Sequence, residues 1–477
     1  MSTGTIGLIL VFALGAVMLG IGIWTSKRIK TSEDYYVGGR NLGSLVTIST
    51  QCATFVGGGM TLGWIGLGFR YGLSAAWYGA PQALGFVFMA IVLVKHMRNT
   101  GKFISLPDWF DSMYKHKGLS IIASIVCLIV PITWVTAQTT AAARMMESIG
   151  VPYLVGVFVI GGVVITYTTV GGYLADCYTD TLQWILLLLI FICTIPLAFI
   201  HAGGLSSIIA NTPSYMMDVS KVHGMPSYTI LLWMVSGLVS GMGLQSSYQK
   251  IYSARTDRIA KQGLYATGIA TIFFAVVTAF VGMACFKLGA PSVLLNDKVW
   301  PWFLAKYVPG WVAVFYAVCV MMATMSTADS MLNSVSLTVT HDLYSKYINP
   351  KASDKKVLRI GIIVSAVFGI LALYWATAGA WMITLFGMSY TLGAGPLAGA
   401  VITAALLKKK ANPTCIMAGL ILGAVTGFIT LQIPTLVSIP AGGTVFSFSM
   451  SILVALGGSY LFKSKALVAD AAVQSNI

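Results

Sequence analysis

A carbonyl and two hydroxyl side chains could form a cation site inside an apolar segment of this 477-residue chain. In the stretch ATMSTADSMLNS, Ala323, Ser326 and Thr327 are spaced i, i+3 and i+4, so in a helix they lie on one face. Hard cations take oxygen ligands, and these three oxygens carry no charge. The pattern therefore predicts a site for a monovalent cation such as Na⁺. The alternative is that Ser326 and Thr327 hydrogen-bond to the preceding turn of their own helix, as hydroxyls in membrane helices often do.

The segment that carries these residues is one of many long apolar runs. The chain is 57% hydrophobic and 9% charged, with a mean hydropathy of +0.84, whereas soluble domains carry roughly 25% charged residues. This composition predicts an all-α, multi-pass membrane protein of one transmembrane domain, 1–477. A span takes about 20 apolar residues, which gives about 13 spans. They are expected at 5–25, 45–69, 74–94, 119–147, 151–170, 181–201, 226–247, 263–285, 309–340, 358–376, 380–406, 414–433 and 443–462.

The orientation follows from the positive charges, because Lys and Arg concentrate in cytoplasmic loops. Most of the 29 Lys and Arg residues fall in the loops on one side when the N-terminus is placed outside. An odd number of spans then places the C-terminus in the cytoplasm. Residues 1–26 carry no charge, so the first run is expected to be a retained helix rather than a cleaved signal peptide.

The net charge of +15 does not indicate a nucleic-acid partner, because the cations lie in short clusters between apolar runs. The seven cysteines show no paired spacing and mostly lie in apolar segments, so we expect neither a disulfide framework nor a metal site for them. The motifs of zinc peptidases, serine hydrolases and ATP-driven pumps are absent from the sequence, and we expect no enzyme and no cofactor.

Two spans carry glycines that could interrupt the helix. The second contains FVGGGMTLGWIGLGF, with Gly57, Gly58 and Gly59 in succession, and the seventh contains VSGLVSGMGLQSS. Small residues can simply permit close packing. However, each glycine weakens a helix by about 1 kcal/mol relative to alanine. Two glycine-interrupted spans, five spans apart, favour an inverted-repeat transporter with its site near the bilayer midplane.

Four stretches resemble the sodium:solute symporter family. They are GGRNLG before the first glycine-rich span, TVGGYLADCYTDTLQ at 169–183, YQKIYSARTDRIAKQG at 248–263, and ATMSTADSMLNSVSLTVTHDLY from residue 323. Their order and the expected topology extend the likeness to nearly the whole chain. The family includes sodium/proline, sodium/pantothenate and sodium/glucose carriers.

The resemblance implies a leucine-transporter-type fold of two inverted five-helix repeats. It places an extra helix at 5–25, the repeats at 45–201 and 226–406, and two further helices at 414–462. It implies that the sodium ligands are the carbonyls of Ala53, Val56 and Ala323 and the hydroxyls of Ser326 and Thr327.

Two aspartates are expected near this site. By resemblance, Asp180 lies along the inward route of the cation, although Thr179 or Asp180 could equally cap a helix N-terminus. Asp329 is expected to face away from Ser326 and Thr327, near Asn333, as a structural or gating contact.

The solute is less well defined by the sequence. The following polar or aromatic residues are candidates for the cavity: Gln82, Gln138, Ser236, Ser240, Gln245, Trp381 and Tyr390. Each could instead be a buried group with a local partner; Gln82 and Gln138 are the best two, because amides in an apolar span need partners. Arg144 could clamp a carboxylate, but its position near the end of its span and Glu147 at i+3 favour an outer gate.

These residues predict sodium-coupled symport of a small organic solute by alternating access. A weak likeness to the pantothenate carriers in AARMMESIGVPY and FRYGL favours an organic anion, and the replacement of the proline carriers' seventh-span residues by glycine and Gln245 disfavours proline. The alternatives are a proton-coupled or sodium-independent carrier of a sugar or amino acid, and a channel-like facilitator. The expected setting is a bacterial inner membrane, with the lipid bilayer, Na⁺ and the solute as partners and a monomer as the functional unit.

Overall fold

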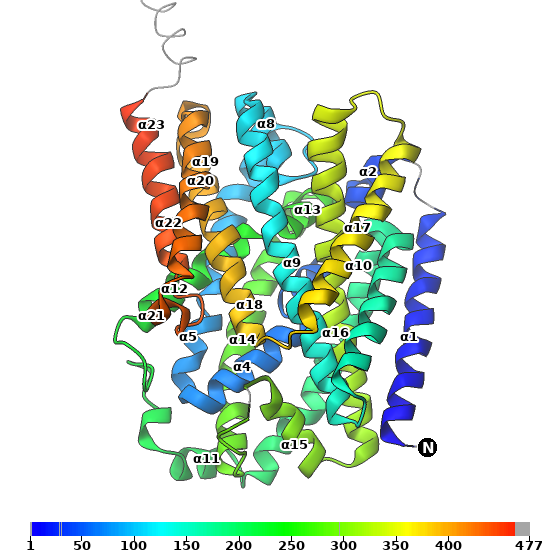
Figure 1. Ribbon diagram of the computed structural model, residues 1–477, viewed down its shortest axis with the longest axis vertical. Helices are drawn as coiled ribbons and strands as arrows, with labels where there is room; N and C mark the ends of the chain where they lie inside the picture. The colour runs from blue at the N-terminus through cyan, green and yellow to red at the C-terminus, as the bar shows by residue number, and fades with distance from the viewer. Residues whose placement is uncertain (1, 28, 30, 295, 463–477) are drawn as a thin grey trace, which may run out of the picture.

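The computed structural model describes residues 2–27, 29, 31–294 and 296–462, and within these ranges the chain is helical without a single β-strand. Long apolar runs favour this outcome, because a helix satisfies its backbone hydrogen bonds internally where no water is present. Figure 1 shows an upright bundle whose N-terminus lies at the bottom and whose last described helix lies at the top.

The helices of the first half are α1 Thr3–Ser26, α2 Ser32–Val37, α3 Ser44–Phe55, α4 Gly58–Tyr71, α5 Ala76–Gly79, α6 Gln82–Phe88, α7 Val94–Thr100, α8 Leu106–Tyr114, α9 Lys117–Ser148, α10 Tyr153–His201 and α11 Leu205–Asn211. Those of the second half are α12 Thr229–Ser240, α13 Gln245–Ser253, α14 Asp257–Lys287, α15 Val299–Tyr307, α16 Gly310–Leu337, α17 Asp354–Ala376, α18 Met382–Ser389, α19 Gly395–Leu407, α20 Pro413–Thr430, α21 Pro434–Val437, α22 Thr444–Ile452 and α23 Gly458–Leu461.

Ten of the described helical segments are long and apolar enough to cross a membrane, or eleven if the bent α12–α13 pair forms one crossing. The sequence predicts about thirteen spans. The difference arises partly because residues 58–99 pass as one bent segment, and partly because Tyr153–Thr169 is short. The exact number of spans and the side that each end faces stay predictions, whereas the multi-pass membrane character is clear.

The helix α10 joins two segments for which the sequence predicts separate spans, 151–170 and 181–201. Its only non-helical residue is Gly172, with φ 61° and ψ −172°. A left-handed φ costs little for glycine, so the chain turns there and the helix resumes at once. The two predicted segments are therefore separate helices that meet at a kink, and only the expected boundary is wrong, because the second helix begins directly after Gly172 rather than at residue 181.

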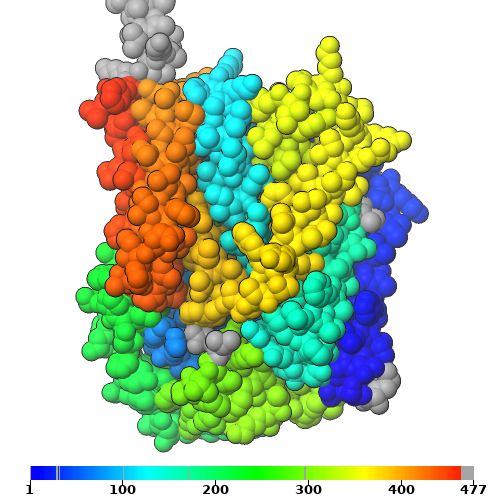
Figure 2. All heavy atoms as spheres, viewed as in Figure 1, coloured from blue at the N-terminus to red at the C-terminus, as the bar shows by residue number. Residues whose placement is uncertain are grey.

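The centre of the bundle is formed by α16, which packs along α9 and α10. Its most apolar window is 83% buried, whereas that of α1 is 22% buried. Figure 2 shows α1 on one side of the bundle and the C-terminal helices on the other. The polar residues of α16 are therefore held deep inside the protein, where other side chains rather than lipid must satisfy them.

Candidate cation and solute site

The first glycine-rich segment is broken, as the sequence predicts. α3 ends at Phe55 and α4 begins at Gly58, because Val56 leaves the helical region with φ −96° and ψ 59°. The glycines also serve close packing: a Cβ on Gly57 would lie 2.2 Å from Thr327 Oγ1, and one on Gly58 would lie 2.7 Å from a carbonyl of α16. These glycines therefore both interrupt the helix and permit close packing against α16.

The second glycine-rich segment is broken in the same manner. α12 ends at Ser240, a short turn covers Gly241–Gly243, and α13 leaves at an angle of 50° to the first part. A Cβ on Gly243 would lie 2.1 Å from the Cα of Ala394, so this turn packs tightly against the segment after α18. The molecule thus contains two interrupted helices, α3–α4 and α12–α13.

The break between α3 and α4 lies against the hydroxyl face of α16. Ser326 Oγ lies 3.3 Å from the Ala53 carbonyl oxygen, and Thr327 Oγ1 lies 3.3 Å from the same oxygen. Ser326 also donates to the Ala323 carbonyl at 2.8 Å, which is the local bond of the alternative interpretation. Four of the five expected ligand residues therefore meet, and the fifth, Val56, is fully buried at the break itself.

This arrangement gathers uncharged oxygens from two helices in a place closed to solvent. Ala53, Ser326 and Thr327 are each at most 2% exposed. A hard monovalent cation is the ligand that such oxygens suit, because no excess negative charge has to be neutralised. The residues present fit Na⁺, with α3 supplying carbonyls and α16 supplying hydroxyls.

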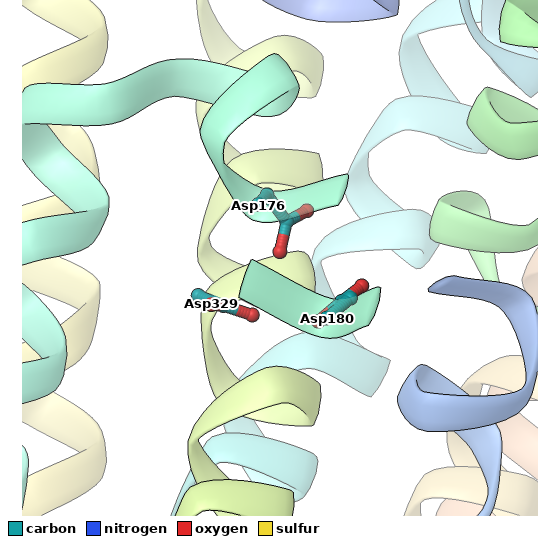
Figure 3. A group of neighbouring side chains, drawn as sticks. All are labelled: Asp176, Asp180 and Asp329. Atoms are coloured by element: carbon teal, nitrogen blue, oxygen red, sulfur yellow. The ribbon is translucent and has the colours of Figure 1, made fainter. Parts of the chain in front are cut away.

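A second polar cluster lies beside this face, and Figure 3 shows its three aspartates. Ligand oxygens of Asp176, Asp180 and Asp329 lie within 4.8 Å of one another, and all three side chains are buried. Asp180 accepts a hydrogen bond from Thr50 of α3. Asp329 accepts one from the Tyr167 hydroxyl at 2.6 Å.

The helix-cap interpretation of Thr179 or Asp180 is wrong. Asp180 lies well inside α10, eight residues beyond Gly172, so it does not cap a helix N-terminus. Thr179 likewise donates to the Ala175 and Asp176 carbonyls, the bonds of a helix interior. Asp329 bonds to Tyr167 and lies beside the other two carboxylates, a buried polar contact, while its expected nearness to Asn333 stays a prediction.

The positive charge of this cluster comes from Lys250 of α13, a residue that the sequence does not single out. Its ammonium donates to the Thr50 carbonyl at 3.0 Å, to Ser330 Oγ at 3.1 Å and to the Thr54 hydroxyl. It lies 3.7 Å from Asp180 Oδ2. The spacing of Asp176 and Asp180, i and i+4, could have indicated that the two share a face. Lys250 lies beyond the expected end of the seventh span, at residue 247, so its burial could not be inferred.

Of the best two solute candidates, Gln138 lies at the α3–α4 break, whereas Gln82 lies against α12. Gln138 of α9 accepts a hydrogen bond from the Gly59 N–H at 3.0 Å, while its Nε2 has no protein acceptor in the described ranges. The amide of Gln82 and the hydroxyl of Tyr390 are buried and make no well-formed hydrogen bond to a described residue. These three groups therefore offer free donors and acceptors.

Aromatic rings border the same region. Phe55, the last residue of α3, lies 4.5 Å from Phe86 and 5.6 Å from Trp134, measured between ring centroids. Trp134 in turn lies 5.0 Å from Phe386 and 6.4 Å from Tyr390. These rings are buried and pack against one another, and buried aromatic rings with a few polar groups beside them have the composition typical of small-molecule sites.

The other solute candidates are engaged elsewhere. Ser236 donates to the Leu232 and Ala441 carbonyls, and Ser240 to the Gly237 carbonyl. Gln245 accepts from the Leu106 N–H at 2.9 Å, which ties α13 to α8. Trp381 lines a separate cavity of about 280 Å³ between α18, α20 and the segment 431–443.

Arg144 has several partners. Its guanidinium lies 3.1 Å from Glu147, 3.9 Å from Asp297 and 4.3 Å from the Tyr153 ring. It also donates to the Gly379 carbonyl at 3.4 Å. Burial raises the pKa of the Asp297 carboxyl, and Arg144 acts in the opposite direction. A guanidinium engaged in this way joins α9 to two loops and is poorly suited to clamp a solute carboxylate.

Comparisons with known proteins agree with this architecture. The model of the sodium:solute symporter family matches residues 35–423. The chain is 26% identical to the osmoregulated proline transporter OpuE of Bacillus subtilis, over 86% of each chain. It is 27% identical to the sodium/proline symporter of Escherichia coli, over 88% of this chain and 86% of the relative. It is 26% identical to a human high affinity choline transporter, over 80% of this chain and 69% of the relative.

Solved structures show the same fold. A Na⁺-coupled sialic acid symporter, described in a substrate-bound outward-open state with a novel Na⁺ site, superposes with a TM-score of 0.80 at 18% identity, covering 96% of this chain and 98% of that one. The nucleobase-cation-symport-1 transporter Mhp1 in a closed conformation gives 0.61 at 16% identity, with coverages of 90% and 95%. The chain belongs to the sodium:solute symporter family: it is a membrane transporter rather than an enzyme, and Na⁺ is its coupling ion.

Proposed function

We propose that Na⁺ binds where the α3–α4 break meets α16, at the carbonyls of Ala53, Val56 and Ala323 and the hydroxyls of Ser326 and Thr327. The observation that supports this is the approach of both hydroxyls to the Ala53 carbonyl oxygen. Na⁺ bound there joins α3 to α16. The cation thereby favours one arrangement of the broken helix, which in turn orders the solute site beside it.

The repeats at 45–201 and 226–406 then move relative to each other in alternating access. One charge moving down 100 mV supplies about 2.3 kcal/mol, and a tenfold Na⁺ gradient adds about 1.4 kcal/mol. The sum of about 3.7 kcal/mol supports accumulation of several hundredfold for each Na⁺. Coupling requires that Na⁺ and the solute raise each other's affinity by the same factor.

The solute that the geometry supports best is a compact molecule with a carboxylate. The first N–H groups of α4 have no acceptor within their helix, and a helix N-terminus favours an anion. The Gln138 amide lies beside them, and aromatic rings border the region. An amino-acid zwitterion, as in the proline-transporting relatives, and an organic anion such as pantothenate both present this carboxylate. The aromatic lining favours a quaternary ammonium solute as the second candidate, since such cations bind on ring faces.

The test is thermal stability of the purified protein in Na⁺ and in K⁺, because a ligand that binds only the folded state raises the melting temperature. Ser326→Ala and Thr327→Ala should each remove most of the Na⁺ effect. Ser334→Ala is the matched control, since Ser334 is buried on the same helix and bonds only to the Met331 carbonyl in its own turn. If both ligand variants keep the full Na⁺ shift, the ligand assignment is wrong.

The same scan in Na⁺ with a panel of carboxylates, zwitterions, sugars and quaternary amines identifies the solute class. A proton-coupled carrier would show no Na⁺ shift. A channel-like facilitator would fail to concentrate the solute in proteoliposomes with a Na⁺ gradient. We further propose that the protein works as a monomer in a bacterial inner membrane, with its N-terminus outside and its C-terminus in the cytoplasm.

A further inference from the structure

Lys250 is a buried lysine that the sodium and solute sites do not account for. Its side chain is 2% exposed and its helix, α13, is the second part of the α12–α13 pair. A charged ammonium is stable in such a place only if it is well paired and hydrogen-bonded. All three of its N–H donors find oxygen acceptors, at Thr50, Thr54 and Ser330.

These contacts join four helices at one point. Thr50 and Thr54 belong to α3, Ser330 to α16 and Asp180 to α10, while Lys250 itself belongs to α13. In Figure 1, α13 lies above α12, toward the end predicted to be cytoplasmic, and Leu42 just before α3 pairs with Ala254 just after α13, so the same end of α3 lies there too. The Lys250 ammonium therefore ties α3 and α13 to the two long helices of the centre.

The tie is next to the proposed sodium site along both helices that form it. Thr54 follows Ala53 directly, and Ser330 lies three residues after Thr327, which is about 4.5 Å along the helix axis. A movement of α3 away from α16 would break the Lys250 contacts and separate the sodium ligands together. The two interactions are thus mechanically linked.

We propose that Lys250 is a positioning residue of the transport cycle, an ammonium latch that holds α3 and α13 against α10 and α16 and must be released before Na⁺ can leave inward. The role of the latch in inward Na⁺ release rests on the proposed sodium site. The latch itself is defined only by Lys250 and its acceptors. Na⁺ on the α3–α16 oxygens stabilises the latched arrangement. Release of the latch opens the path past Asp180.

The native thiol of Cys52 reports on this latch. Cys52 lies on α3 between Thr50 and Thr54, is 2% exposed, and its Sγ lies 3.5 Å from Thr267 Oγ1 of α14. Withdrawal of α3 from the bundle would expose it to a water-soluble maleimide. The experiment measures the alkylation rate of the Cys52 peptide by mass spectrometry on the full chain in nanodiscs, in Na⁺ and in K⁺.

Lys250→Met should raise the alkylation rate of Cys52 about tenfold or more in K⁺, because charged hydrogen bonds are lost. Lys250→Arg should stay near the wild-type rate, since it keeps the charge and the donors. Lys287→Met is the matched control: Lys287 also bonds to a carbonyl and a serine hydroxyl, those of Ala202 and Ser207, far from α3. Proteoliposomes add a second readout, in which Lys250→Met should keep solute exchange but lose Na⁺-driven accumulation.

Ser330→Ala guards against a Lys250→Met protein that does not fold, because it removes one acceptor and leaves every charge in place. It should raise the Cys52 rate severalfold. The latch is refuted if folded Lys250→Met or Ser330→Ala protein is alkylated at the wild-type rate, or if Lys287→Met gives the same rise. An absent Na⁺ effect on the wild-type rate would count against the sodium site alone, because the latch is tested in K⁺.

Discussion

Gly57→Ala tests the sodium site through a single methyl group. Gly57 has φ −76° and ψ 167°, which alanine adopts without backbone strain, so only packing is changed. The new Cβ would lie 2.2 Å from Thr327 Oγ1 and 3.3 Å from the Ala323 carbonyl oxygen. Either Thr327 turns its hydroxyl away or α16 retreats from the break. Both responses withdraw an oxygen from the proposed cation shell.

The expected magnitude follows from the cost of an extra methyl in a tight place, about 1–3 kcal/mol. If that cost is borne at the site, the Na⁺ concentration for half-maximal effect rises about 5- to 150-fold, since 1.4 kcal/mol corresponds to a factor of ten. The assay is the melting temperature over a series of Na⁺ concentrations with K⁺ as the balancing ion. Melting in K⁺ alone separates general destabilisation from loss of Na⁺ affinity.

Gly20→Ala is the control, because a Cβ on Gly20 of α1 meets no atom within 4 Å. It should leave the dependence of the melting temperature on Na⁺ concentration unchanged. A Gly57→Ala protein that folds and responds to Na⁺ at wild-type concentrations would show that the break is not beside the cation. The assignment of Ala53, Ser326 and Thr327 would then fail with it.

The remaining predictions concern the solute site and the outer network. Gln138→Leu should raise the solute concentration needed for half of the melting-temperature shift tenfold or more, because the solute loses the unpartnered Nε2 donor, while the shifts over the Na⁺ series without solute change little. Equal losses of apparent affinity for Na⁺ and for the solute would contradict a solute role for Gln138. Burial raises the pKa of Asp297, so the folded state binds more protons than the unfolded state between the ordinary value of 3.8 and the raised value; stability falls as pH rises through that window. Asp297→Asn should flatten this part of the melting-temperature profile, and an unchanged profile would place its cause elsewhere.

The sequence predicts the broken helices and the sodium residues because their signals are local. Three successive glycines lower helix propensity within one turn, and the i, i+3, i+4 spacing of α16 follows directly from helix geometry. Neither depends on which helices become neighbours. The pairing of Ala53 with Ser326 and Thr327 comes from the family resemblance instead, and the structure places these three residues together.

Lys250 and Asp176 could not be assigned in this manner, because their roles depend on span boundaries and on tertiary contacts. The seventh span was expected to end at residue 247, which would leave Lys250 in a loop, whereas α13 continues to Ser253 with every residue buried. The same kind of error placed a loop at residues 171–180, where the second helix already begins after Gly172, and suggested a cap at Asp180. A glycine break inside a helix has the composition of a loop, and only packing distinguishes the two.

The uncharged oxygens of the proposed sodium site suit a cation that has to bind reversibly at this depth. The shell of carbonyls and hydroxyls carries no net charge, and the nearest charged pair, Lys250 and Asp180, lies beside it rather than in it. The partial negative charges of the oxygens attract Na⁺, and this attraction is stronger in a protein interior than in water. Because the carboxylates do not themselves enclose the ion, it can leave without a strong ion pair being broken. Coordination by neutral oxygens alone meets the requirement for an ion that must bind on one side of a membrane and be released on the other.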